Sequence, residues 1–118
     1  MPEIVAPVSR VYAAGDTLSI KHTITDNDGD AQDITGWTFR FALSRTVGGT
    51  TVLGTELSPA TATVTLTTPA SGIMHIGITK TDTASLTGTY YFETEGQDGA
   101  GEESTVARGY MTFKPTQI

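Results

Sequence analysis

The chain contains no cysteine, so neither a disulfide nor a thiolate metal site can hold its fold. Basic residues are also few, seven against thirteen acidic ones, and the net charge of −6 would repel a nucleic-acid backbone. No apolar run approaches the roughly 18 residues of a membrane span, and the first ten residues, MPEIVAPVSR, lack the basic and apolar regions of a signal peptide. We therefore expect no cofactor, no nucleic-acid partner and no membrane contact.

Threonine is abundant and alternates with Val, Ile, Tyr and Phe, a composition that favours a pleated sheet. Two runs have clear period-2 alternation. Their apolar faces are Leu18, Ile20, His22 and Ile24 in the first run, and Trp37, Phe39, Phe41 and Leu43 in the second. Weaker strands are predicted at 51–57, 62–67, 73–79, 89–95 and 105–114, and one short helical turn at 81–86. The pattern predicts an all-β, immunoglobulin-like antiparallel β-sandwich of about seven strands with that one helical turn.

The predicted sandwich occupies residues 15–118, and residues 1–14 form an N-terminal arm or edge strand. Prolines at positions 2 and 7 exclude the arm from the centre of a sheet. Its apolar residues are Ile4, Val5, Val8 and Val11. The arm either forms an edge strand of its own sandwich or adds a strand to a neighbouring subunit, and these four residues are the predicted partner-binding residues.

A cluster of aspartates surrounds a glycine in the stretch TDNDGDAQDITGW. An EF-hand loop needs glycine at its sixth position and glutamate at its twelfth. Counted from Asp26, these positions hold Ala31 and Trp37, so the EF-hand interpretation fails. Asp-Gly is typical of a tight turn. We predict a turn and no metal, and the alternative is an irregular calcium site at Asp26, Asp28 and Asp30.

No combination of residues in the sequence indicates catalysis. There is no GxSxG elbow, and two histidines, His22 and His75, are too few for a zinc site. Glu93 and Glu95 lie two residues apart on one predicted strand, at a separation that glycosidases use, but a solvated sheet face explains them more simply. We predict that the chain is not an enzyme and has no catalytic residue.

Several short motifs follow one another along the chain. They are GDT at 15–17, DNDG at 26–29, DITGW at 33–37, TPASG at 68–72 and TDTASLTGTYYFE at 81–93. This succession resembles the immunoglobulin-like domains of tailed-bacteriophage virion proteins, such as the N-terminal domain of baseplate upper proteins. The resemblance implies that Trp37 lies in the core. It also implies a corner before the penultimate strand, formed by Asp82, Ala84, Leu86, Gly88 and Tyr90.

The resemblance implies a non-enzymatic structural protein of a tailed-phage virion, an assembly or attachment module of the tail, baseplate or neck that is assembled in the host cytoplasm. Baseplate upper proteins continue into long C-terminal segments, whereas this sequence ends at KPTQI, so the attachment role of those segments is not carried over. The alternatives are a capsid decoration (cement) protein and a glycan-binding module for host-surface adhesion. The expected partners are further copies of the chain or other virion proteins, with a host-surface glycan in the last case.

Overall fold

The computed structural model describes residues 3–4 and 9–115, and side chains from residue 12 onward. In these residues the chain forms nine strands, a 3-10 turn and a short helix. The strands are β1 (Glu3–Ile4), β2 (Ser9–Ala13), β3 (Leu18–Thr25), β4 (Thr38–Ser44), β5 (Thr51–Gly54), β6 (Thr63–Thr68), β7 (Ile73–Ile78), β8 (Gly88–Gln97) and β9 (Glu103–Lys114). The 3-10 turn η1 spans Pro69–Ser71, and the helix α1 spans Lys80–Thr83. Neither is long and apolar enough to cross a bilayer, and the described residues contain no other helix.

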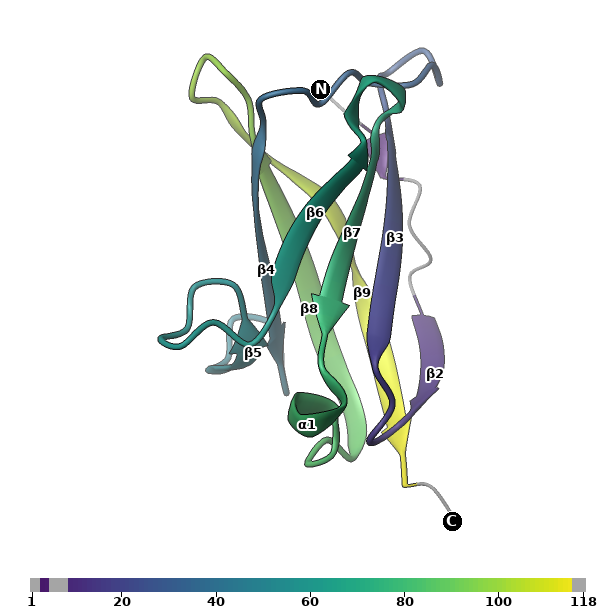
Figure 1. Cartoon of the computed structure of the whole chain (residues 1–118), viewed down its shortest axis with the longest axis vertical. Coiled ribbons are helices and arrows are strands. Elements are labelled where there is room, and N and C mark those ends of the chain that lie inside the picture. Colours follow the sequence, from purple (N-terminus) through teal and green to yellow (C-terminus); the bar gives the residue numbers. More distant parts are fainter. Residues whose placement is uncertain (1–2, 5–8, 116–118) are drawn as a thin grey trace.

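The strands form two sheets that pack face to face (Figure 1). One sheet has the order β1-β3-β7-β6, and the other has the order β2-β9-β8-β4-β5. All paired strands are antiparallel except β2 and β9, which are parallel. This is the strand order of an immunoglobulin-like sandwich, so the predicted fold class is confirmed. All seven predicted strands are present, and the two additional ones lie in the arm.

The arm contributes an edge strand to each sheet. In β1, Ile4 pairs with Ile24 of β3, and in β2, Val11 pairs with Thr112 of β9. The described parts of the arm therefore pair within their own sandwich, which is the first of the two alternatives for this segment. Val5 and Val8 lie outside the described residues, and a role of the arm in contacting a partner stays a prediction.

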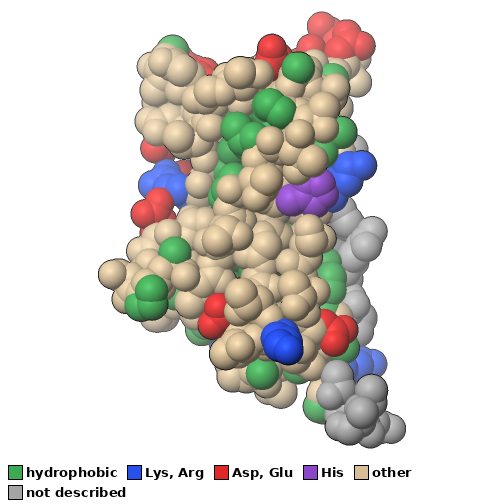
Figure 2. Space-filling view, viewed as in Figure 1, with side chains coloured by type: hydrophobic (Ala, Val, Ile, Leu, Met, Phe, Trp, Pro, Cys, Tyr) green, Lys and Arg blue, Asp and Glu red, His purple; other side chains and the backbone are tan. Residues whose placement is uncertain are grey.

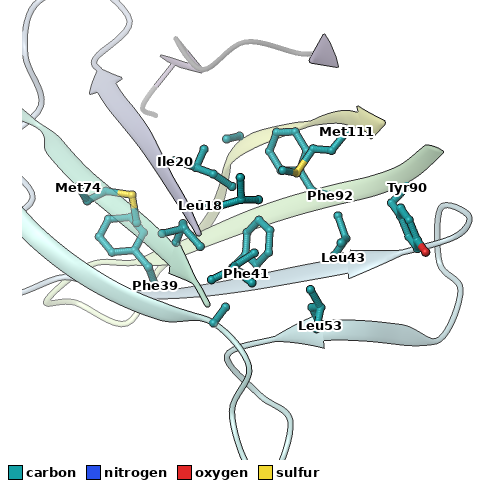
Figure 3. Close-up of a cluster of buried hydrophobic side chains, with 14 of the residues drawn as sticks. Leu18, Ile20, Phe39, Phe41, Leu43, Leu53, Met74, Tyr90, Phe92 and Met111 are labelled. Carbon is teal, nitrogen blue, oxygen red and sulfur yellow. The ribbon is translucent and has the colours of Figure 1, made fainter. Parts of the chain in front are cut away.

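The core lies between the two sheets and is built from the inward faces of β3, β4, β7, β8 and β9 (Figure 3). The alternation of apolar and polar residues in β3 and β4 explains why these faces point inward. In β3, Leu18, Ile20 and Ile24 are buried as expected, and in β4, Phe41 and Leu43 are at most 1% exposed. Ring stacking continues across strands, since the ring centroids of Phe41 and Phe92 lie 6.1 Å apart. Buried aromatic and aliphatic surface of this kind is the main stabilising contribution in a domain of this size.

The corner before β8 forms much as the resemblance implied. The amide of Thr87 donates to the Tyr90 hydroxyl at 3.3 Å, which ties the start of β8 to the chain just before it. The Arg45 guanidinium covers the Tyr90 ring at 4.2 Å from the centroid. The helical turn begins at Lys80, one residue earlier than predicted, because Thr79 caps it. The cap is a hydrogen bond from the Asp82 amide to the Thr79 hydroxyl.

Trp37 lies at the edge of the core rather than inside it. It precedes β4, is half-buried, and stacks on Phe39 with 6.1 Å between ring centroids. The ring of Trp37 therefore packs against the core, as the resemblance implied, but the residue is only partly buried.

Replacing Tyr90 with Phe should lower the free energy of unfolding by about 1 kcal/mol, because the Thr87 amide loses its acceptor while the edge contact of the ring with Phe113 stays. Urea denaturation measures this change. Tyr110→Phe is the matched control, because Tyr110 is 47% exposed, and its effect should stay below about 0.5 kcal/mol. Equal losses in the two variants would contradict the role of the corner hydrogen bond.

Candidate functional site

The outer faces of the two sheets differ in chemistry. The four-stranded sheet presents exposed threonines of β6 and Lys21 of β3, and the His75 ring bonds to the Thr67 hydroxyl through Nδ1 at 2.6 Å. Figure 2 views this side of the molecule and shows few charged side chains near its centre, small hydrophobic patches, and acidic side chains at the upper end, the left edge and the lower part. The exposed large hydrophobic residues of the described chain all belong to the other sheet or its β4–β5 connection: Val47, Val52 and Tyr110.

The outer face of the five-stranded sheet is built around three cross-strand pairs of β8 and β9. Tyr91 pairs with Tyr110, and their ring centroids lie 5.6 Å apart in an edge-to-face arrangement. On one side of the tyrosines Glu93 is opposite Arg108. On the other side Thr89 is opposite Thr112, with their hydroxyl oxygens 2.9 Å apart. Because side chains alternate along a strand, all six project from the same face.

The tyrosine pair continues sideways across the sheet. Ser44 of β4 pairs with Tyr91 on one side and with Thr51 of β5 on the other. Val52, the next residue of β5, is 40% exposed. We call Val52, Ser44, Tyr91 and Tyr110 the tyrosine row. It crosses four neighbouring strands at about 4.8 Å spacing, and its end members Val52 and Tyr110 are exposed, whereas Ser44 and Tyr91 between them are only 7% and 9% exposed.

Beyond Glu93 the same face becomes strongly charged. The Arg40 guanidinium of β4 bonds to Glu95, and it lies 3.2 Å from a Glu103 oxygen and 3.9 Å from a Glu56 oxygen. Hydrogen bonding to Glu95 and the charges of all three carboxylates raise the pKa of Arg40, which therefore stays charged. Beside this charged cluster lies a shallow groove of about 270 Å³, whose floor is Ala42 and whose walls include Glu93.

Glu93 and Glu95 were predicted to lie on a solvated sheet face, and both lie on the outer side of β8. Glu95 is bound to Arg40, and Glu93 accepts a hydrogen bond from the Thr105 hydroxyl at 3.3 Å. Burial, and next the charge of Glu93, raise the pKa of the Tyr91 phenol, which stays protonated as a hydrogen-bond donor. The position of these groups does not test whether the chain is an enzyme, and that expectation stays a prediction.

The aspartate loop between β3 and β4 is a turn with a defined hydrogen-bond pattern. Asp26 Oδ1 accepts from the amides of Asp28 at 2.9 Å and Asp30 at 3.0 Å. The loop between β8 and β9 repeats the pattern, since Asp98 Oδ1 accepts from the amides of Ala100 at 2.9 Å and Glu102 at 3.0 Å. The shared signal, D-x-x-G followed by an acidic residue, is present in the sequence as DNDGD and DGAGE, but our sequence analysis missed it.

A similar side-chain acceptor follows in the same loop, where the Thr35 amide donates to Asp33 Oδ1 at 2.9 Å. Hydrogen bonding to Thr35 lowers the pKa of Asp33. Within residues 3–4 and 9–115 no group of three or more His, Cys, Asp and Glu side chains could hold a metal ion. The structure thus gives Asp26 and Asp33 turn-forming roles, while calcium binding at Asp26, Asp28 and Asp30 stays an untested alternative.

His22 is enclosed in the core and links the two sheets. It is 1% exposed, and its Nε2 lies 3.0 Å from the Thr94 hydroxyl of β8. Its Nδ1 has no hydrogen-bond partner among the described residues, so only one of the two ring nitrogens is hydrogen-bonded there. Burial, and next the charge of His75, lower the pKa of His22 to about 4. A histidine held neutral inside the sandwich is a structural residue rather than a surface ligand.

Comparison with known proteins supports the fold alone. No family model and no curated protein matches the chain. Among solved structures 208 chains are similar, and a fold shared so widely does not specify a function. One of them is the crystal structure of CopC from Methylosinus trichosporium OB3b, with a TM-score of 0.61 and 10% sequence identity. The match covers 100% of this chain and 98% of that chain.

The expectation of a structural role in a tailed-phage virion is wrong, because a solved structure that this chain resembles over its whole length is CopC, which is not a phage protein. The physical reason lies in the motifs behind the expectation. Each ends in, or contains, a glycine with positive φ: Gly15, Gly29, Gly36, Gly72 and Gly88. Such glycines specify turns of the sandwich, so the motifs indicated the fold and not a virion role. A glycan-binding module would need exposed aromatic residues in its loops for stacking, whereas the exposed aromatic residue among the described side chains, Tyr110, lies in a strand.

The turn interpretation of the aspartate loop predicts unequal effects of two neighbouring carboxylates. Asp26→Ala should lower the free energy of unfolding by about 1 kcal/mol, because two amides lose their acceptor. Asp28→Ala should have little effect, since no hydrogen bond to its side chain is found in the described chain. Denaturation with and without calcium measures both. Stoichiometric calcium binding that raises the melting temperature and requires Asp26, Asp28 and Asp30 together would contradict the turn interpretation.

Burial of His22 predicts that the sandwich loses stability in mild acid. The unfolded chain takes up a proton near the ordinary pKa of 6.5, whereas folded His22 resists protonation until about 4. The stabilisation is therefore fully present above pH 6.5 and falls as the pH drops to 4, by up to about 3 kcal/mol.

Denaturant unfolding between pH 4 and 7 measures this slope. The double variant His22→Leu with Thr94→Val removes both hydrogen-bond partners and should flatten the slope that is due to His22. His75→Gln is the control and should keep most of the slope, because burial of His22 is its main cause. An unchanged slope in the double variant would show that other groups cause the acid sensitivity.

Proposed function

We propose that this chain is a non-catalytic protein-binding module and that it binds through the outer face of its five-stranded sheet. The observation that carries the proposal is the tyrosine row, in which the exposed Val52 and Tyr110 flank the buried Ser44 and Tyr91 across the centre of that face. Exposed apolar surface that lies together, with polar residues around it, marks interaction sites on soluble proteins.

The distribution of exposed apolar residues supports this choice of face. Val47, Val52 and Tyr110 are 66%, 40% and 47% exposed, and all three belong to the five-stranded sheet or its β4–β5 connection. The four-stranded sheet presents threonines, Lys21 and His75 instead. Random exposure of single apolar residues would not favour one sheet, so the asymmetry argues for a dedicated surface.

The residue types on the face also fit protein recognition. Tyrosine and arginine are enriched at interfaces and carry much of the binding energy there. Tyr110 and Arg108 lie two residues apart on β9 and project from the same side of the sheet. The charged cluster around Arg40 lies further along the face, where it forms a polar rim beside the apolar centre.

The absence of catalysis is part of the proposal and is supported by where the polar groups lie. His22 is held neutral in the core, away from solvent. Glu95 is bound to Arg40, and the groove beside it is shallow and open to water. Water-exposed, ion-paired carboxylates are poor general acids, because catalysis by a carboxylic acid depends on an environment that raises its pKa.

The proposal predicts that binding depends on Tyr110 and not on the opposite sheet. Tagged wild type, Tyr110→Asp and Thr65→Asp would each be used to capture proteins from cells that express the gene, with quantitative mass spectrometry as the readout. Thr65 is exposed on the four-stranded sheet and is the matched control. A true partner, including untagged copies of this chain, should be retained by wild type and Thr65→Asp and fall at least about tenfold with Tyr110→Asp.

Each protein that passes this test would then be purified and titrated against the chain by calorimetry, with the same variants. A set of captured proteins that is unaffected by Tyr110→Asp, or is lost equally with Thr65→Asp, would contradict the proposed surface.

A further inference from the structure

We infer that the partner of this face is a second copy of the chain, bound in a symmetric dimer whose two-fold axis runs parallel to β8 and β9 and between them. The inference rests on the proposed function and adds the identity of the partner. It follows from the order in which charged and apolar residues are paired across β8 and β9.

A two-fold axis between β8 and β9 places β8 of one copy over β9 of the other. Each outward residue of β8 pairs with a residue of β9 in its own sheet. Across the interface it then faces that same β9 residue of the second copy. Tyr91 therefore faces Tyr110 of the second copy, and Glu93 faces Arg108 of the second copy. Each contact occurs twice, as symmetry requires of an isologous interface.

Other placements of the second copy lack this complementarity. An in-plane axis perpendicular to the strands at the level of the tyrosines would place Glu93 opposite Thr89 of the second copy. The same axis at the level of Glu93 and Arg108 would place like charges opposite each other. Of these axes, the one parallel to β8 and β9 places Glu93 opposite Arg108 of the second copy and brings no like charges face to face, and like-charge contacts are costly at an interface.

The charged cluster around Arg40 lies at one end of the contact in this arrangement. β4 of one copy is opposite β2 of the second copy, because each of these strands flanks the central pair. The pairing of β2 with β9 covers only the segment from Tyr110 to Lys114, so Arg40, which lies beside Glu95 at the other end of the sheet, has no described part of β2 opposite it. Glu95 and Glu103 lie on the central strands and face the uncharged Thr105 and Gln97 of the second copy.

The size of the shared face fits a weak dimer. The ten residues of β8 span about 34 Å, and the four strands that overlap, β2, β9, β8 and β4, give a width of about 14 Å at about 4.8 Å spacing. The product is about 500 Å² for each copy, which falls in the range of weak, transient interfaces. With a net charge of −6 on each copy, long-range repulsion opposes association, so the complementary centre has to provide the attraction.

A charge-reversal experiment tests this geometry. Sedimentation equilibrium of the wild type from micromolar to millimolar concentration should show a shift from 12.4 kDa toward twice that mass, 24.8 kDa. Glu93→Arg makes both positions of the pair positive, and Arg108→Glu makes both negative. Each variant alone should lose self-association at least tenfold. Mixed in equal amounts, they should form a heterodimer, because the two positive positions of one variant face the two negative positions of the other.

Lys21→Glu is the matched control, since it makes the same charge change as Arg108→Glu on the outer face of the other sheet and should leave the dimer intact. Circular dichroism melting checks that every variant is folded. A wild type that stays monomeric up to millimolar concentration overturns the inference, and so do single variants that still dimerise or folded variants whose mixture does not associate.

The two proposals can fail separately. If the chain is monomeric and a different protein is captured in a Tyr110-dependent manner, the binding face stands and the second copy is wrong. If neither association depends on Tyr110, both are wrong.

Discussion

The packing of Phe92 against Phe41 sets the register on which the rest of the molecule depends. Phe92 is 3% exposed and lies in β8, the strand between β4 and β9. Because side chains alternate along a strand, burying Phe92 forces its neighbours Tyr91 and Glu93 to the outer face. A slip of one residue would exchange the inward and outward side chains of β8. It would place the Glu93 carboxylate in the core and the Phe92 ring in water. The core and the candidate binding face are therefore two consequences of one register.

The hydrogen bond between His22 and Thr94 is the polar exception in this apolar interior. It joins β3 to β8 across the sandwich, over 72 residues of sequence. A buried polar pair contributes little net stability, but the cost of leaving either partner unpaired disfavours other alignments of the two sheets. Neutral His22 can be buried beside Thr94, whereas a charged His22 would lose its hydration in the core. The burial that favours this alignment of the two sheets therefore also makes the fold sensitive to acid.

Local patterns explain how much of this could be predicted from the sequence. The alternation in β3 and β4 is strong, because one side of each strand is wholly buried, and it correctly located Ile24 and Phe41. The tyrosine row was not predicted, because it depends on the pairing of Tyr91 with Tyr110, and no local signal fixes the register between two strands. The same limit applies to Arg40 and Glu95, which are 55 residues apart. Positive-φ glycines such as Gly29 and Gly72 were visible as motifs, but turn geometry carries no information about ligands.

The acidic excess of the chain is placed where it does not disturb the centre of the outer face. Asp26 and Asp98 organise the loops at one end of the sandwich, where their carboxylates accept backbone amides. A second group of carboxylates surrounds Arg40 at the rim. Between these regions the pair of Glu93 and Arg108 is balanced in charge and lies beside the tyrosines. Surplus negative charge at the ends and rim repels unspecific neighbours, while a neutral centre allows close approach in one geometry. The surface thus combines solubility with selective contact, and the two properties occupy different residues of the same sheet.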